Sequence, residues 1–126
     1  MTTDENTTLE TLKRLVREFS SDRDWEQFHN PKDLALALVC EVGELLEHMR
    51  YRHNASIAER IATNPHRLEF AHELADCLWL LLRMADVCEI DLSSSLQEKL
   101  ELAAKKYPAA LVRGRPDKYT EYEQAP

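Results

Sequence analysis

The chain has 126 residues, a formal net charge of −7 and only 2 glycines. A domain of this length has room for one hydrophobic core, and the scarcity of glycine beside abundant Ala, Leu, Glu, Arg and Lys favours helices over sheets. The negative charge argues against binding of a nucleic-acid polymer, which needs a basic face, and no apolar run is long and uncharged enough to predict a membrane span.

The first predicted helix has Thr7 as its N-cap and runs to about Ser20. Thr7 is the first residue of a Thr-Thr-Leu-Glu sequence, which has the spacing of a capping box. The next segment, SSDRDWEQFHNP, breaks the helical period and is predicted to be a loop. It contains Trp25, Phe28 and His29. The aromatic rings either fill one end of the core or form a lid that stacks on a flat ligand.

The second predicted helix begins at Asn30-Pro31, an N-cap residue followed by the proline that is favoured at the first helical position. Its apolar pattern reaches about Arg52. Within that pattern Glu41 and Glu44 are three residues apart, so they lie on one face of the helix.

The central predicted helix begins at Asn64-Pro65, after a connector with one expected helical turn, and runs to about Val87. Apolar residues surround it on nearly every side, which is typical of a helix buried among others. Two acids interrupt this apolar run at Glu73 and Asp76, again three residues apart. Buried carboxylates are costly unless they are paired or bind a metal.

The last predicted helix is capped by Asp91 or Ser93 and ends before a proline. We therefore predict a single all-α domain, residues 1–126, built as a four-helix bundle. Its helical core covers about 8–107, and an irregular C-terminal arm covers 108–126.

Three cysteines, Cys40, Cys77 and Cys88, are odd in number and lack paired-thiol spacing. They are predicted to be buried and reduced, as in a cytoplasmic protein. The polar, acidic start of the sequence does not resemble a signal peptide.

Two acid pairs on two apolar helices suggest that Glu41, Glu44, Glu73 and Asp76 converge on a metal ion. Oxygen ligands without cysteine or histidine at ligand spacing indicate Mg²⁺, with Mn²⁺ as a substitute, rather than Zn²⁺. His48 follows Glu44 by four residues and is either a neighbour of this site or a surface residue.

Other interpretations of the acids are weaker. His72-Glu73 starts a zinc-protease-like motif, but the second histidine is absent. Glu69 and His72 have the ExxH spacing of a di-iron carboxylate bundle, which needs this motif twice. A non-catalytic helical module that binds a nucleotide or a protein is a further alternative, although it gives the four acids no role.

The motifs resemble those of MazG-like all-α nucleoside triphosphate pyrophosphohydrolases, specifically the short branch that includes the eukaryotic dCTP pyrophosphatase. The resemblance covers about residues 12–121. It rests on the segment RDWEQFH, on ExxE and ExxD separated by 28 residues, and on Tyr107-Pro108, Arg113-Gly114 and Lys118-Tyr119-Thr120.

The resemblance implies a homodimer or a homotetramer built as a dimer of dimers, with sites between subunits. It implies Mg²⁺-dependent hydrolysis of a nucleoside triphosphate between the α and β phosphates, which yields a monophosphate and pyrophosphate and removes unwanted dNTPs. The metal ligands would be Glu41, Glu44, Glu73 and Asp76, with Glu41 or Glu44 as the catalytic residue that activates water.

By the same resemblance Trp25 and His29 would contact the base and sugar, and Lys99 would contact the phosphates. Tyr107 and Tyr51 complete the expected substrate-binding residues.

Three positions depart from the dCTP-hydrolysing branch. Tyr51 replaces a tryptophan, Leu80 replaces a tyrosine with Trp79 one position earlier, and Ala103 replaces an asparagine. Because these positions surround the base or sugar, the reaction is better predicted than the substrate, which we expect to be dCTP or a related dNTP.

Overall fold

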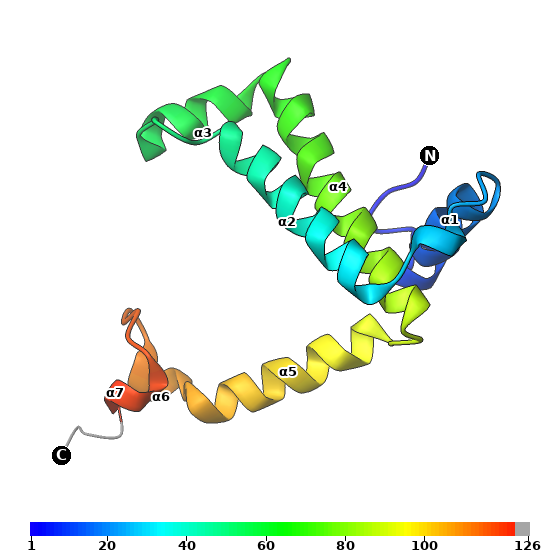
Figure 1. Cartoon of the computed structure of the whole chain (residues 1–126). Coiled ribbons are helices and arrows are strands. Elements are labelled where there is room, and N and C mark those ends of the chain that lie inside the picture. Colours follow the sequence, from blue (N-terminus) through cyan, green and yellow to red (C-terminus); the bar gives the residue numbers. More distant parts are fainter. Residues whose placement is uncertain (123–126) are drawn as a thin grey trace. The chain divides into compact units, whose positions relative to one another are not determined.

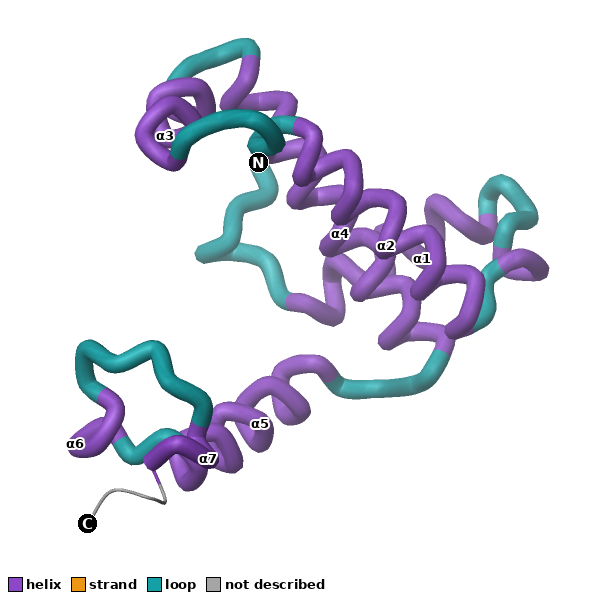
Figure 2. Tube along the Cα trace, turned by 60° about the vertical axis from the view of Figure 1, so that its left-hand side comes forward, coloured by secondary structure: helices purple, strands orange, loops and turns teal. Residues whose placement is uncertain are grey.

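A computed structural model describes residues 1–122, and all regular secondary structure within this range is helical, with no strand (Figures 1 and 2). It divides into two compact units, Met1–Ile90 and Asp91–Pro126. The first unit contains α1 (Leu9–Ser21), the short 3-10 helix η1 (Glu26–Phe28), α2 (Pro31–Glu47), α3 (Asn54–Ala62) and α4 (His66–Val87). The second contains α5 (Leu92–Lys106), α6 (Ala109–Val112) and α7 (Tyr119–Tyr122).

Helix α4 is the centre of the first unit. Helix α2 packs alongside it, and α1 and α3 contact it as well, as Figures 1 and 2 show from two directions. Because α2 and α4 are the two helices that carry the acid pairs, this packing decides where those acids meet.

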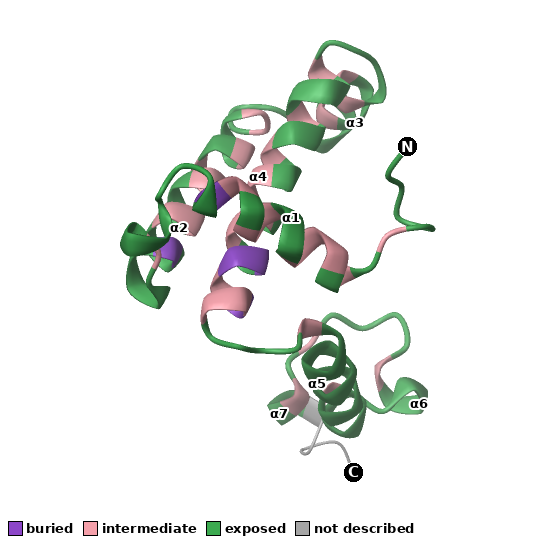
Figure 3. Cartoon of the chain, turned by 90° about the vertical axis from the view of Figure 1, so that its right-hand side faces the viewer, coloured by how far each residue is buried: buried purple, intermediate pink, exposed green. Residues whose placement is uncertain are grey.

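The buried core is small and lies where α1, α2 and α4 meet (Figure 3). Its apolar members are Leu34, Leu82 and Ala85. Ser20 is fully buried, and its hydroxyl donates to the Val16 carbonyl oxygen at 2.9 Å, which satisfies this polar group inside the core.

Two helix ends differ from the prediction. Thr8, not Thr7, caps α1, because its extended backbone lets its hydroxyl accept from the amide of Thr11 at 3.1 Å. Helix α2 stops at Glu47 instead of continuing to about Arg52. A turn follows, and Tyr51 within it has a left-handed φ of 63°, which no α-helix accommodates.

The prediction of an all-α fold is confirmed, but the number of α-helices is seven in the described residues rather than four. The connector before α4 forms the nine-residue α3, longer than the single turn expected. The loop and arm also contain the short helices η1, α6 and α7. Asp91 caps α5, as one of the two alternatives predicted, and accepts from the Ser94 amide at 2.8 Å.

The prediction that α4 is buried on all sides is not met within the first unit. Leu74, Leu78 and Leu81 of α4 each keep more than two fifths of their surface exposed, and Val39 of α2 is 70% exposed. The apolar residues of both helices exceed what the core of the first unit covers.

The three cysteines are free, as predicted, but they are not all buried: Cys40 and Cys88 are exposed, and Cys77 is half-buried. Within the described range, none of the helices has the length and apolar character that crossing a bilayer requires.

Candidate functional site

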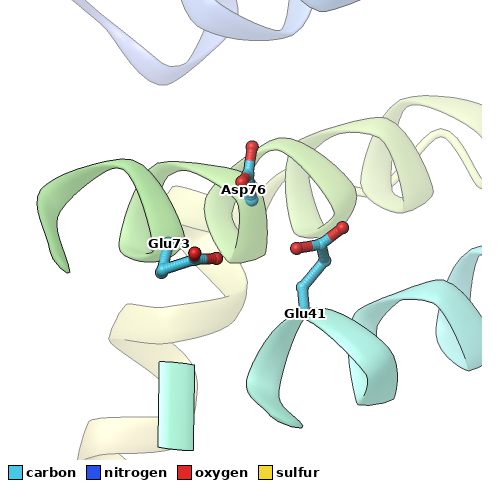
Figure 4. A group of neighbouring side chains, drawn as sticks. All are labelled: Glu41, Glu73 and Asp76. Carbon is cyan, nitrogen blue, oxygen red and sulfur yellow. The ribbon is translucent and has the colours of Figure 1, made fainter. Parts of the chain in front are cut away.

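Three carboxylates converge between α2 and α4. Glu41 projects from α2, while Glu73 and Asp76 project from adjacent turns of α4 (Figure 4). Each of the three residues has one carboxylate oxygen that lies within 4.8 Å of those of the other two. No two of these residues are closer than three positions in sequence. The i, i+3 spacing on α4 and the packing of α2 along it produce this cluster.

Glu41 is the member most affected by its surroundings. Burial raises its pKa, and the negative charge and hydrogen bond of Glu44 and the charges of Asp76 and Glu73 raise it further. The Oε2 atoms of Glu41 and Glu73 are buried and have no hydrogen-bond partner among the described residues. Buried carboxylate oxygens without donors are costly, and a cation between them removes that cost.

The ligand set fits a hard divalent cation. It supplies only carboxylate oxygens, which suit Mg²⁺ or Mn²⁺ rather than Zn²⁺. Glu44, the fourth predicted ligand, is exposed and contacts Glu41 but lies outside the cluster of three. The structure therefore brings together three of the four predicted ligands and places the fourth beside them.

His48 lies against the acid cluster. Its Nε2 atom is 3.7 Å from Glu73 Oε1, and both side chains are mostly buried. The ring of Phe70 approaches the His48 ring edge-on, with centroids 6.2 Å apart. Of the two roles predicted for His48, the structure thus favours a neighbour of the acid site over a surface residue.

A cavity of about 240 Å³ opens beside the acids and is bounded by Glu41 and Asp76. Its remaining walls are formed by aromatic, histidine and aliphatic side chains: Trp25, His29, Ala37, Trp79 and Leu80. Carboxylates on one side and aromatic rings on the other suit a ligand with a charged end and a flat end.

The aromatic wall is organised around Phe19. The Phe19 ring meets Trp79 edge-on at 4.9 Å between centroids and meets Trp25 at 5.9 Å. Trp25 therefore lines the cavity, whereas Phe28 from the same loop is 63% exposed and does not fill the core. Of the two interpretations of this loop, the structure supports the one that places it at a pocket.

The sequence predicts Trp25 and His29 as substrate-binding residues, but it does not predict most of the α4 side chains that line the cavity. Trp79 and Leu80 were noted only as departures from a family pattern. A signal existed, because Asp76, Trp79 and Leu80 follow i, i+3, i+4 spacing and so share a face of α4. Ala37 follows the same rule on α2, four residues before Glu41.

The other predicted substrate-binding residues lie apart from this cavity or in the second unit. Tyr51 is 91% exposed and sits in a separate hollow with Arg50, to which its hydroxyl is hydrogen-bonded. Lys99 is an exposed residue of α5. Tyr107 follows α5, and its ring lies edge-on to that of Tyr119 at 6.0 Å.

The di-iron alternative gains no support from the geometry. Glu69 is hydrogen-bonded to His66, with 3.0 Å between Oε2 and Nδ1, rather than arranged with His72. Neither Glu69 nor His72 belongs to the acid cluster found in the described residues.

A sequence profile described as MazG nucleotide pyrophosphohydrolase domain matches residues 29–110. The matched range begins at His29 and includes all of α2, α4 and α5, so it contains the acid cluster.

Proteins that are similar in sequence or in fold are also pyrophosphatases. The chain is 40% identical over 114 residues to dCTP pyrophosphatase 1 of Homo sapiens, over 90% of this chain and 67% of that protein. The values are the same for dCTP pyrophosphatase 1 of Rattus norvegicus. The crystal structure of a pyrophosphatase from Archaeoglobus fulgidus is 33% identical and superposes with a TM-score of 0.75, over 86% of this chain and 99% of that chain. The similarity thus extends from sequence to fold.

Proposed function

Since the chain belongs to the family of MazG nucleotide pyrophosphohydrolases, as its motifs predicted, and is therefore a nucleoside triphosphate pyrophosphatase, we propose that its substrate is a pyrimidine deoxynucleoside triphosphate, with dCTP first. The products would be the monophosphate and pyrophosphate, from cleavage between the α and β phosphates. One observation carries this proposal: a cluster of half-buried carboxylates borders a cavity with two tryptophans in its wall.

The cofactor in this proposal is Mg²⁺, held by Glu41, Glu73 and Asp76 with Glu44 beside them. When bound, Mg²⁺ polarises phosphate oxygens, neutralises their charge and acidifies water. The unpartnered oxygens of Glu41 and Glu73 are the atoms that support this assignment. Four carboxylates and two divalent ions would carry charges of −4 and +4, which lets a triphosphate approach an acidic protein.

The residue that takes a proton from water is Glu41 or Glu44. Glu41 borders the cavity, where a carboxylate can accept a proton from a water molecule beside the phosphates. Glu44 is more exposed and hydrogen-bonds to Glu41, so it is placed to orient Glu41 or to take the proton itself.

The base and sugar would occupy the aromatic side of the cavity, next to Trp25 and His29. At about 240 Å³ the cavity is slightly smaller than the ~300–1,000 Å³ of pockets that enclose a drug-sized ligand. It therefore suits part of a nucleotide, with the phosphates lying toward the carboxylates. Tyr51, Lys99 and Tyr107 would add contacts in the assembled protein.

We further propose a homodimer or a homotetramer, because apolar residues of α2 and α4 stay exposed in the first unit. The whole chain, residues 1–126, would act as one domain, since the matched range 29–110 extends across both compact units. A cytoplasmic location stays a prediction from the free cysteines.

The test is release of pyrophosphate from a panel of canonical and modified dNTPs and NTPs, each with Mg²⁺ and with EDTA. We expect metal-dependent release of pyrophosphate and monophosphate in equal amounts, with dCTP among the best substrates. Release of orthophosphate alone would mean that cleavage does not occur between the α and β phosphates, and this would contradict the proposal.

Variants separate the enzyme from a non-catalytic binding module. Glu41→Gln and Asp76→Asn should each lower kcat by at least about a hundredfold while the protein stays folded. Glu69→Gln is the matched control, because it removes an exposed acid from the same helix α4, outside the cluster, and should leave kcat unchanged. No turnover by the folded wild type would favour the binding module.

A further inference from the structure

A buried arginine lies one helical turn beyond the cavity wall. Arg83 of α4 is 5% exposed and follows Trp79 by four residues and Leu80 by three, on the same face of the helix. Its Nε atom donates to Nδ1 of His29 at 2.8 Å, across 54 positions of sequence. A nearly buried cation thus makes direct contact with a side chain of the cavity wall.

Arg83 is held in place by acids. Its Nη1 atom donates to Asp86 Oδ2 at 2.7 Å, and its Nη2 atom lies 3.9 Å from Glu26 Oε1. Asp86 in turn accepts two hydrogen bonds from Arg17 of α1, one of them from Nε at 2.9 Å. These bonds hold the pKa of Asp86 below its usual value, so it is ionised near neutrality. The cations Arg17 and Arg83 face the anions Asp86 and Glu26, and the charges balance.

The contact from Arg83 determines the protonation of His29. An arginine Nε–H can only donate, so His29 Nδ1 must offer a lone pair. A doubly protonated ring would place one N–H group against another, and therefore the ring is neutral with its proton on Nε2. Burial and the charge of Arg83 both lower the pKa of His29 and outweigh the opposing effect of Glu26.

Nε2 of His29 has no hydrogen-bond partner among residues 1–122. We propose that Arg83 is a positioning residue that fixes His29 as the Nε2–H tautomer, so that His29 donates a hydrogen bond to an acceptor on the nucleotide's base or sugar. The nucleotide in this statement rests on the proposed function, whereas the tautomer rests on the contact between Arg83 and His29 alone.

The tautomer can be measured directly. In the full-length protein labelled with ¹⁵N, long-range histidine ¹H–¹⁵N correlations distinguish Nδ1–H, Nε2–H and doubly protonated rings. The His29 signals are those missing from His29→Gln. At pH 7 we expect Nε2 to be protonated and Nδ1 to be bare. A protonated Nδ1 would overturn the proposal, and this measurement needs no activity and no variant of Arg83.

Kinetics test the positioning role. Arg83→Met keeps an unbranched apolar stem and removes the donor, and it should raise KM for dCTP roughly tenfold with kcat little changed. His29→Gln carries its own amide donor and needs no tautomer. In the His29→Gln background Arg83→Met should therefore add almost nothing to KM. Arg14→Met, at an exposed arginine of α1, is the control and should leave KM unchanged.

Equal increases in KM on both backgrounds would mean that Arg83 acts through general packing, and the proposal would fail. If Arg83→Met does not fold, Arg83→Lys retains the charge but lacks the Nε donor of the planar guanidinium and should raise KM in the same direction. If the wild type hydrolyses no nucleotide, the proposed function fails, while the histidine correlations still decide the tautomer.

Discussion

Helix α4 contributes to two groups of partly buried charges that differ in their balance of sign. Toward its N-terminal end, Glu73 and Asp76 meet Glu41 of α2, and all three are acids. Toward its C-terminal end, Arg83 and Asp86 form an ion pair that Arg17 of α1 extends. Among residues 1–122, the Oε2 atoms of Glu41 and Glu73 in the first group have no hydrogen-bond partner. In the second group the two cations Arg17 and Arg83 face the two anions Asp86 and Glu26.

This difference separates a binding site from a structural network. Partly buried charges of one sign are costly without a counter-charge, so we expect the acid cluster to bind a cation. Paired charges need no ligand, and they fix geometry, here the orientation of His29. The two groups should therefore respond in opposite directions when one charge is removed, and the following predictions test this.

The largest effect on stability is expected from Asp86→Asn. This change leaves Arg83, whose side chain is 6% exposed, without its main counter-charge. Removing one partner of a buried pair costs about 3 kcal/mol, which urea denaturation at pH 7 would measure as a lower midpoint with the same slope. A loss below about 0.5 kcal/mol would show that the pair is solvated.

The next effect is stabilisation of the wild type by Mg²⁺. A cation that binds only the folded protein stabilises it by about 2.7 kcal/mol at a concentration of 100 times Kd. Thermal unfolding of the nucleotide-free protein with and without Mg²⁺ measures this shift. Asp76→Asn should abolish it, and Asp86→Asn should retain it even though the protein starts from a lower melting temperature.

Part of this comparison was predictable from sequence. The i, i+3 spacing of Glu41 with Glu44 and of Glu73 with Asp76 places each pair of acids on one face of its helix. Because both helices are otherwise apolar, the sequence predicts that the two acid pairs face each other. The spacing does not determine how deeply a side chain is buried, so it could not distinguish the half-buried Glu41 from the exposed Glu44.

The balanced network could not be predicted in the same way. Arg83 contacts His29, and Arg17 contacts Asp86. In both contacts the two partners come from distant segments of the chain, so the packing of those segments sets the network. The end of α2 was missed for a related reason. Residues 48–53 have acceptable helix propensity, and the left-handed turn at Tyr51 depends on the connection to α3 and α4.

A smaller effect of opposite sign is expected at Glu41. Because burial and neighbouring acids raise its pKa, the ionised form is disfavoured in the folded, metal-free protein. Glu41→Gln should therefore raise the melting temperature of the metal-free protein at pH 7 by a few degrees while it abolishes hydrolysis. Glu69→Gln is the control and should not give this gain.

The pH dependence checks the same assignment. A carboxyl with a raised folded-state pKa binds protons more readily when folded, so it adds stability as the pH falls from above that pKa toward the unfolded value of about 4.3. The metal-free wild type should become more stable over this window, and Glu41→Gln should lose that component. Asp86 has the opposite sign, because its lowered pKa makes its contribution disappear at more acidic pH.

The smallest effect on the free energy of unfolding is expected from a solvent-exposed ion pair. Arg14 and Glu18 lie four residues apart on α1, 3.1 Å from Nη1 to Oε1, and both side chains are more than half exposed. Arg14→Met should change the free energy of unfolding by less than about 0.5 kcal/mol, because water and salt screen such pairs. Its bond to a carboxylate is of the same chemical kind as the bond from Arg83 to Asp86. If urea denaturation gave similar losses for Arg14→Met and Asp86→Asn, burial would not be what distinguishes the network on α4.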